Sequence, residues 1–432
     1  MKNIIYIFLL LSISNWGQET PGKSQQKSIL LLNGIAHIGD GTVINKSAIG
    51  IKDGKIILVK DALTNTIDKT KYDTVIDISK QHIYPSFIAP NTTLGLQEIG
   101  AVRASKDQEE SGTINPNVRA IVAYNTDSDI TPTVRTNGIL VGQITPRGGV
   151  ISGTSSVVHF DAWNWEDAVY RMDDGVHLNW PNVIKKSGWW AEPEPANKSK
   201  GYSDKILNIE TFFNTAQAYS NEKKPLEQDL KLEAMRGVFS GDKSLYVHAS
   251  NYKEINDVIN FKKKYGISKV VIVGGHDAYL ISKKLNENGI SVILQRVHSL
   301  PERPEDDVYL PYKLPKLLND AKVLFCLENA GDMEQMGTRN LPFYGGTAVA
   351  YGLEYEQAVQ CITLNAAKIL GVDNLLGSLT EGKDATFFIS NGDALDMMTN
   401  EVTLAFVQGR MISLDNHQKR NYEKYKAKYE MK

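Results

Sequence analysis

The sequence predicts an α/β protein, in which a closed (β/α)8 barrel of the TIM type carries a small discontinuous β-sandwich domain built from both chain ends. Two observations predict this fold. Strand and helix patterns alternate over about 280 residues, as in parallel strands joined by crossover helices. Short β-rich segments flank this region on both sides. A doubly wound open sheet is the alternative, but the strand count is near eight and no glycine-rich phosphate fingerprint follows the first strand.

Length and composition exclude some functions. A chain of 432 residues with 42% hydrophobic residues can bury a large core. The net charge of −2 provides no basic surface for nucleic acid, so we expect no nucleic-acid partner. Cys326 and Cys361 lie in separate apolar patterns without a second ligand at metal-binding spacing. Two buried thiols are therefore favoured over a disulfide or a cysteine-bound metal.

The first residues predict export. Lys2 precedes an apolar run over residues 4–13, and the small and polar sequence SNWGQET follows. This layout is typical of a secretory signal, here residues 1–17, and the run is too short to span a bilayer. We expect a periplasmic or secreted protein with no membrane segment after cleavage. Residues 18–27 then form a polar, flexible leader.

Strand signals at both chain ends predict the smaller domain. Residues 28–38, 48–52, 55–59 and 75–78 are β-rich, and Asp53-Gly54 marks a hairpin. Similar runs return at 385–390 and 402–407. We therefore expect a composite β-sandwich of residues 28–82 and 376–412, a barrel over 83–375, and a charged C-terminal helix over 413–432.

The barrel begins with a predicted strand over residues 83–89, followed by a polar turn that contains Asn91 and Thr93. Further strands are predicted at residues 138–145, 157–160, 175–179, 244–248, 269–273, 291–294 and 323–327. Helices are predicted at residues 210–221, 226–238, 252–265, 278–288 and 314–321. Functional side chains of such a barrel lie at the carboxyl ends of the strands, so each strand end supplies candidates.

Several phrases together resemble the amidohydrolase superfamily, and most closely its imidazolonepropionase-like and prolidase-like branch. They are GKI at 54–56, VID at 75–77, YPSFIAPNT at 84–92 and LGSLTEGKDATFFI at 376–389. The resemblance covers residues 28–412. It implies a hydrolase that acts on carbon–nitrogen bonds of an amide, a cyclic amide or a dipeptide. It also implies a divalent metal such as zinc, held by a His-x-His pair after strand one, histidines after strands five and six, and an Asp after strand eight.

The chain departs from this pattern at the metal site. Asn91 and Thr93 occupy the His-x-His positions, and an amide and a hydroxyl are weak ligands for a transition metal. His248 and His276 match the other histidines and are the candidate metal ligands. The resemblance therefore implies an incomplete or altered metal site. A turn stabilised by Asn91 and Thr93 and structural roles for both histidines are the alternatives.

The strand-eight carboxylate has two candidates. Glu328 falls at the strand end and Asp332 follows shortly after, so both are candidate catalytic residues, although Glu328 could equally cap the next element.

Candidate substrate-binding residues are Asn91, Thr93, Arg147, Arg296 and His298. An arginine suits a carboxylate-bearing substrate because its guanidinium binds both oxygens. The small-residue loop beside Arg147 is a candidate anion site. The alternative is a tight turn that carries Trp163 and Trp165 into the core.

Two hypotheses follow. The first is an exported amidohydrolase-like enzyme with an incomplete metal site, acting on a small-molecule or peptide substrate. The second is a catalytically silent barrel of the same fold that binds a small ligand or pairs with an active relative. The sequence leaves open whether the chain forms homo-oligomers.

Overall fold

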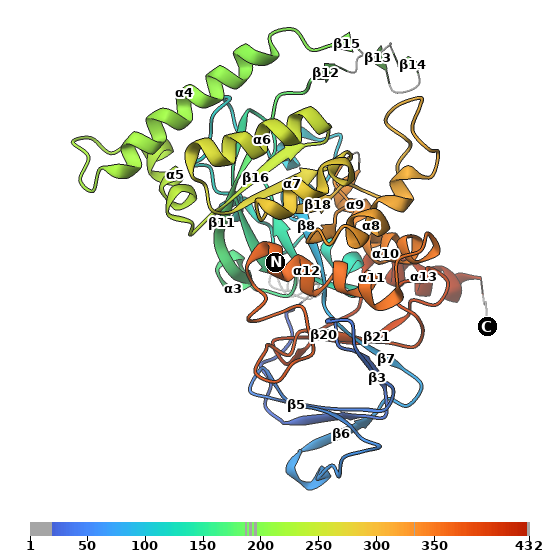
Figure 1. Ribbon diagram of the computed structural model, residues 1–432. Helices are drawn as coiled ribbons and strands as arrows, with labels where there is room; N and C mark the ends of the chain where they lie inside the picture. The colour runs from blue at the N-terminus through green and yellow to red at the C-terminus, as the bar shows by residue number, and fades with distance from the viewer. Residues whose placement is uncertain (1–19, 186–187, 190–191, 194–196, 332, 430–432) are drawn as a thin grey trace, which may run out of the picture.

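The computed structural model describes residues 20–429 except 186–187, 190–191, 194–196 and 332. The predicted signal peptide, residues 1–17, lies outside these residues, as do the first two residues of the leader. Figure 1 shows a barrel surrounded by helices and, below it, a smaller β-rich domain. Within the described ranges, no helix combines the length and the apolar composition that a membrane crossing requires.

The barrel is one sheet of eight strands in the order β19-β18-β17-β16-β11-β10-β9-β8, and its two end strands lie against each other. The strands are β8 (Phe87–Thr92), β9 (Ile139–Ile144), β10 (Ile151–His159), β11 (Val169–Asn179), β16 (Ser244–Ala249), β17 (Val270–Gly274), β18 (Ser291–Leu294) and β19 (Phe325–Leu327). The predicted α/β barrel with a separate sheet domain is confirmed.

One barrel strand differs from the predicted parallel arrangement. β10 pairs antiparallel with both β9 and β11, whereas the other neighbouring strands of this sheet pair in parallel. The turn between β9 and β10 is too short for a crossover helix, and Gly148 and Gly149 adopt positive φ angles of 81° and 63° in it. Regular alternation of strand and helix is therefore interrupted between β9 and β10.

The predicted strand over residues 83–89 is two strands in two different sheets, so that prediction was wrong. β7 (His82–Pro85) belongs to the smaller domain, and β8 starts after Ser86. Ser86 N–H donates to Thr386 O of that domain at 3.1 Å, and Ser86 Oγ accepts from Leu140 N of the barrel at 3.2 Å. A continuous apolar run does not reveal where a chain passes from one buried sheet to the next.

Helices cover the barrel. They are α2 (Thr131–Arg135), α3 (Trp165–Ala168), α4 (Tyr202–Asn221), α5 (Leu230–Ser240), α6 (Tyr252–Tyr265), α7 (Ser282–Glu287), α8 (Leu310–Asp320), α9 (Glu334–Gly337), α10 (Leu341–Ala350), α11 (Tyr355–Cys361) and α12 (Leu364–Leu370). α6 shows why these segments fold locally. Asn251 and Glu254 form a capping box at its start, and Gly266 ends it in a left-handed conformation. Ile255, Val258 and Ile259 supply its buried face.

Short elements occur in both domains. The 3-10 helices are η1 (Lys69–Lys71), η2 (Arg103–Ser105), η3 (Ala120–Ala123), η4 (Ala278–Ile281) and η5 (Thr338–Asn340). Two small ribbons pair β12 (Ile184–Lys185) with β15 (Asn197–Lys198) and β13 (Gly188–Trp189) with β14 (Glu192–Pro193).

The smaller domain contains two sheets, ordered β5-β4-β1-β6 and β22-β21-β20-β7-β2-β3. Their strands are β1 (Ile29–Leu32), β2 (Ile35–His37), β3 (Val43–Ile44), β4 (Ser47–Lys52), β5 (Lys55–Asp61), β6 (Thr74–Asp77), β7, β20 (Phe387–Ser390), β21 (Val402–Val407) and β22 (Arg410–Met411). β20 pairs with β7, so strands from both parts of the chain share one sheet. Leu31, Ile49, Phe387 and Phe406 belong to the core of this domain.

The C-terminal helix α13 (His417–Lys428) lies on the barrel surface near α2, where Thr133 Oγ1 donates to Gln418 Oε1 at 2.8 Å.

Candidate active site

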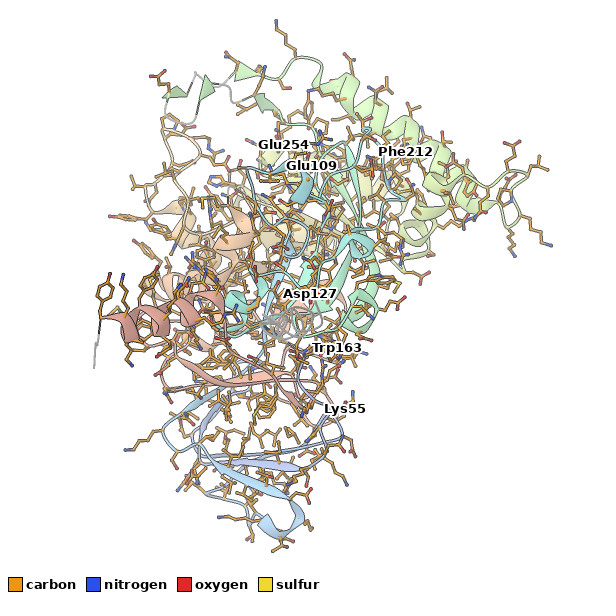
Figure 2. The ribbon with its side chains drawn as sticks, turned by 180° about the vertical axis from the view of Figure 1, so that it is seen from behind. Lys55, Glu109, Asp127, Trp163, Phe212 and Glu254 are labelled. Atoms are coloured by element: carbon orange, nitrogen blue, oxygen red, sulfur yellow. The ribbon has the colours of Figure 1, made fainter. Side chains whose placement is uncertain are left out.

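A cavity of about 670 Å³ opens where barrel strands end. Among the described residues, seven carboxamide side chains line it: Asn91, Gln97, Gln108, Asn179, Asn182, Gln295 and Gln335. The charged or titratable side chains of its described lining are Glu109, Arg147, His248, Glu328 and Glu334. Figure 2 shows Glu109 on the part of the barrel that lies away from Lys55 of the β-rich domain. The cavity therefore lies on the barrel face where side chains from several strands converge.

Asn91 is the centre of a hydrogen-bond network in this cavity. The residue is 2% exposed, its φ is 48°, and its Nδ2 donates to Glu328 Oε2. Arg147 Nη1 donates to Asn91 Oδ1 at 2.9 Å, and Arg147 Nη2 donates to Asn91 O at 2.8 Å. The same Nη2 lies 3.0 Å from Glu334 Oε1. The guanidinium is thus bonded on both of its outer nitrogens.

The Glu328 carboxyl is protonated at neutral pH. Burial raises its pKa to about 8 and outweighs the hydrogen bond from Asn91 and the positive charge of Arg147, both of which lower it. The nearby Glu334 carboxylate raises the pKa further. Because burial disfavours the charged form, Glu328 can donate a proton to a group bound in the cavity.

A second network runs beneath the cavity from Asp174 to His248. Ser155 Oγ donates to Asp174 Oδ1 at 2.7 Å, and His177 Nε2 lies 3.0 Å from Ser155 Oγ. His177 Nδ1 in turn lies 3.0 Å from His248 Nε2. Asp174, Ser155 and His177 are all fully buried, whereas His248 lines the cavity. The chain therefore connects a buried carboxyl group to the cavity wall.

Neighbouring groups fix the hydrogen positions at the Asp174 end of this chain. The Asn91 N–H donates to Gln143 Oε1 at 3.1 Å, so the Gln143 amide presents Nε2 to Asp174 Oδ2, 2.8 Å away. Tyr246 O–H donates to the same oxygen at 2.6 Å. Burial raises the pKa of Asp174, and the hydrogen bonds from Tyr246, Ser155 and Gln143 oppose this rise. Ser155 donates to one Asp174 oxygen, and Gln143 and Tyr246 donate to the other.

The two histidines then take defined tautomers. Burial lowers the pKa of His177 well below its usual value and that of His248 to about 3, and Arg147 lowers both further. Both rings are therefore neutral at neutral pH. Because Ser155 gives its hydrogen to Asp174, it accepts from His177 Nε2–H, and His177 Nδ1 accepts from His248 Nε2–H. Nδ1 of His248 consequently carries a lone pair.

Four of the predicted site residues meet at the cavity: Asn91, Arg147, His248 and Glu328. The described residues that line it do not include Thr93, His276, Arg296 or His298. The candidate catalytic residue Asp332 lies outside the described residues.

The remaining candidates lie elsewhere. Thr93 is buried, and its Oγ1 has no hydrogen-bond partner among the described residues. His276 Nε2 lies 3.2 Å from Asp306 Oδ2, and its Nδ1 lies 3.1 Å from Gln295 Nε2. His298 lines a separate pocket and contacts Thr347 Oγ1 at 2.6 Å. Arg296 contributes to neither of these pockets.

In the glycine loop beside Arg147, the predicted anion site, carbonyl oxygens accept hydrogen bonds from nearby side chains. Ser152 Oγ donates to Gly148 O at 2.7 Å, and Asn179 Nδ2 donates to Gly149 O at 2.9 Å. Trp163 is 65% exposed, so the alternative that carried both tryptophans into the core was wrong for Trp163, whereas Trp165 is partly buried and packs against the barrel core.

Sequence reasoning missed Gln143, Ser155, Asp174, His177 and Glu334. One signal was available, because β10 and β11 contain the polar runs SGTSS and DDG at positions where barrel strands are usually apolar. Glu334 follows an irregular loop and had no such signal.

The fold and the cavity at the strand ends define an α/β-barrel protein with a separate domain of two sheets. The chain belongs to the amidohydrolase family, whose sequence pattern matches residues 193–412. Members of this family generally use a divalent metal such as zinc.

One curated relative is 5-methylthioadenosine/S-adenosylhomocysteine deaminase of Saccharophagus degradans, which is 20% identical over 256 residues. The match spans 55% of this chain and 57% of that protein, so the two correspond over little more than half their lengths.

Solved structures support the fold. An amidohydrolase from Thermotoga maritima MSB8 superposes with a TM-score of 0.75 and 22% identity over 89% of this chain and 99% of its own. A Xaa-Pro dipeptidase with bound methionine in its active site gives a TM-score of 0.55 and 15% identity, over 89% and 100% of the two chains. An adenosine deaminase from Xanthomonas campestris with bound zinc gives 0.52 and 13%, over 93% and 98%.

Proposed function

We propose that the protein hydrolyses a carbon–nitrogen bond of a small amide, cyclic amide or dipeptide in the cavity at the barrel mouth. Family membership supports a hydrolase, and the deaminases and dipeptidases among the similar proteins act on bonds of this type. The observation that carries the proposal is the position of Glu328. Its protonated carboxyl group follows the last barrel strand, faces the cavity and is held by Asn91.

Glu328 supplies the proton that the reaction needs. In the hydrolysis, a water oxygen bonds to the carbonyl carbon and the carbon–nitrogen bond breaks. The neutral Glu328 carboxyl group, near its pKa, gives its proton to the leaving nitrogen, and the resulting carboxylate takes up the proton that the water releases. Asn91 fixes the orientation of the carboxyl group, and Arg147 fixes Asn91. His248 also lines the cavity, and the lone pair of its Nδ1 can accept a hydrogen bond from a ligand N–H.

We propose further that the metal site of this family is altered here. Among the residues that the structure describes, no three His, Cys, Asp or Glu side chains converge as a metal site requires. Asn91 Oδ1 is bonded to the Arg147 guanidinium, and His248 Nε2 is bonded to His177. This donor set does not fit a divalent cation, so the proposed chemistry contains no metal-dependent step.

A second candidate function is ligand binding without catalysis, alone or beside an active relative. The network of Asn91, Arg147, Glu328 and Glu334 favours it, because these polar groups hydrogen-bond to one another.

Turnover measurements separate the two functions. The purified protein is assayed against dipeptides, cyclic amides and aminopurine nucleosides, with and without added zinc, and its metal content is measured. Hydrolysis that is lost in Glu328→Gln but independent of zinc supports the first proposal. Binding without turnover in both conditions supports the second, and hydrolysis that requires zinc contradicts the altered site.

We also propose that the protein is exported and works in the periplasm or outside the cell. The signal-like sequence of residues 1–17 supports this. Mass spectrometry of the mature protein should give an N-terminus near Gln18, and a full-length cytoplasmic product would contradict export.

A further inference from the structure

The cavity lining is chemically selective. A carboxamide carries N–H donors and a carbonyl acceptor without a net charge, and seven described side chains of this kind line the cavity. The amides of Asn91, Asn179 and Gln295 already bond to protein groups, and the other four are Gln97, Gln108, Asn182 and Gln335. A ligand matches such a surface best when it also carries donors and acceptors side by side, as an amide group does. The lining composition therefore favours polar but uncharged ligands.

The cation of the lining is already neutralised. Arg147 donates to Asn91 and to Glu334, and Glu334 also accepts from the Gly331 N–H at 3.0 Å. A ligand carboxylate would have to displace Glu334 from the guanidinium and leave its charge partly buried without a partner. Glu109, exposed at the rim, adds negative charge that repels an anion further.

The position of His248 points in the same direction. The chain from Asp174 through Ser155 and His177 holds the His248 ring as an acceptor at Nδ1. A carboxylate has only acceptors, so it gains nothing from this nitrogen. An amide N–H supplies the matching donor.

Among the substrate classes of the proposed function, we propose that the cavity prefers uncharged amides, in particular cyclic amides and peptide amides, over dipeptides with a free carboxylate, because Glu334 holds Arg147. Glu334 is thus a specificity-determining residue. The inference rests on the proposed function only for the location of the site and the substrate classes compared, because it concerns binding and not turnover.

Calorimetry with a matched pair of probes tests the discrimination. N-acetylprolinamide and N-acetylproline differ only in an amide and a carboxylate, and the cyclic dipeptide of glycine and proline provides a ring without charge. At neutral pH we expect both uncharged probes to bind about tenfold more tightly than N-acetylproline, as one charge-assisted contact predicts. Equal or tighter binding of N-acetylproline, or no binding by any of the three, overturns the proposal.

Glu334→Gln tests the cause. The variant keeps an acceptor for Gly331 N–H but removes the charge that neutralises Arg147, so the affinity ratio should shift about tenfold toward N-acetylproline. Glu334→Asp, whose shorter side chain should not reach Arg147, is the second variant and should shift the ratio in the same direction.

Glu109→Gln is the matched control, because it removes one acidic charge from the same cavity without releasing Arg147. Its ratio should change less than about twofold. An equal shift in this control would assign the discrimination to net charge and overturn the role of Glu334. A protein that binds the amides without cleaving them contradicts the proposed hydrolysis and leaves this inference intact.

Discussion

Two histidine pairs occupy opposite regions of the molecule and look alike in isolation. His37 and His82 lie in the β-rich domain, with His37 Nε2 3.0 Å from His82 Nδ1. His177 and His248 lie in the barrel, also with ring nitrogens 3.0 Å apart. His37 stacks on Tyr84 at 4.2 Å between ring centroids, and His177 stacks on Tyr246 at 4.7 Å.

The two pairs differ in what their ends contact. His37 Nδ1 lies 2.7 Å from Glu356 Oε1, so the first pair joins the β-rich domain to helix α11 of the barrel side. The second pair starts at the buried Ser155 and Asp174 and ends at the cavity. A histidine pair therefore does not mark a site by itself. Its position relative to the strand ends decides whether it holds the fold or faces a ligand.

The largest expected effect is the change of unfolding free energy with pH. Stability should fall toward alkaline pH because of Glu328 in the barrel, and toward acid pH because of His82 in the β-rich domain. The pKa of Glu328 is raised to about 8, so the unfolded state loses this proton first as pH rises. Its contribution to stability is complete below about pH 4.5 and falls as pH rises toward 8, by at most about 5 kcal/mol. Glu328→Gln should remove this loss, measured by urea unfolding from pH 5 to 9. Parallel profiles for both proteins would contradict the protonated carboxyl.

The contact of His37 and His82 with Glu356, which joins the β-rich domain to α11, should lose stability on the acid side of the pH range. Burial lowers the pKa of His82, followed in size by the effect of His37. The folded state therefore prefers the neutral ring, and stability falls as pH drops below about 6.5. His82→Gln should flatten the acid side of the unfolding profile and leave its alkaline side unchanged.

Removal of the buried carboxylate compares the two regions directly. Asp174→Ala leaves donors of Ser155, Gln143 and Tyr246 without an acceptor, so we expect a loss of about 3 kcal/mol in unfolding free energy. Glu356→Ala should lose only about 1 kcal/mol, because Glu356 is less buried and contacts one histidine. The midpoints of urea unfolding measure both losses. Equal losses would mean that the network from Asp174 to His248 stabilises the fold no more than the contact between His37 and Glu356 does.

The smallest effect on stability should come from His248. His248→Gln should change the unfolding free energy by less than about 1 kcal/mol, because the ring faces a cavity. It should weaken binding of the cyclic dipeptide about tenfold, since one hydrogen bond is lost. His37→Gln is the control and should leave this binding unchanged, as measured by calorimetry.

Local signals explain which parts of the fold were predictable. The predicted helix over residues 252–265 coincides with α6, because a capping box and Gly266 mark both ends. The strand over 83–89 failed because two sheets share one apolar run.

The site was predictable only where a side chain follows a strand. Asn91, His248 and Glu328 lie at or just after strand ends, and Arg147 follows one closely, so position alone selected them. Asp174 lies inside a strand, and its role depends on partners from other strands, which one strand's periodicity does not show.

Anomalous diffraction from crystals grown with excess zinc tests the central claim most directly, namely that a network around Asn91 and Arg147 has replaced the metal site at this barrel mouth. The account predicts no zinc signal in the cavity and an Arg147 guanidinium still bonded to Asn91 and Glu334. A zinc ion bound by His177, His248 and Glu328, with Arg147 displaced, would contradict it.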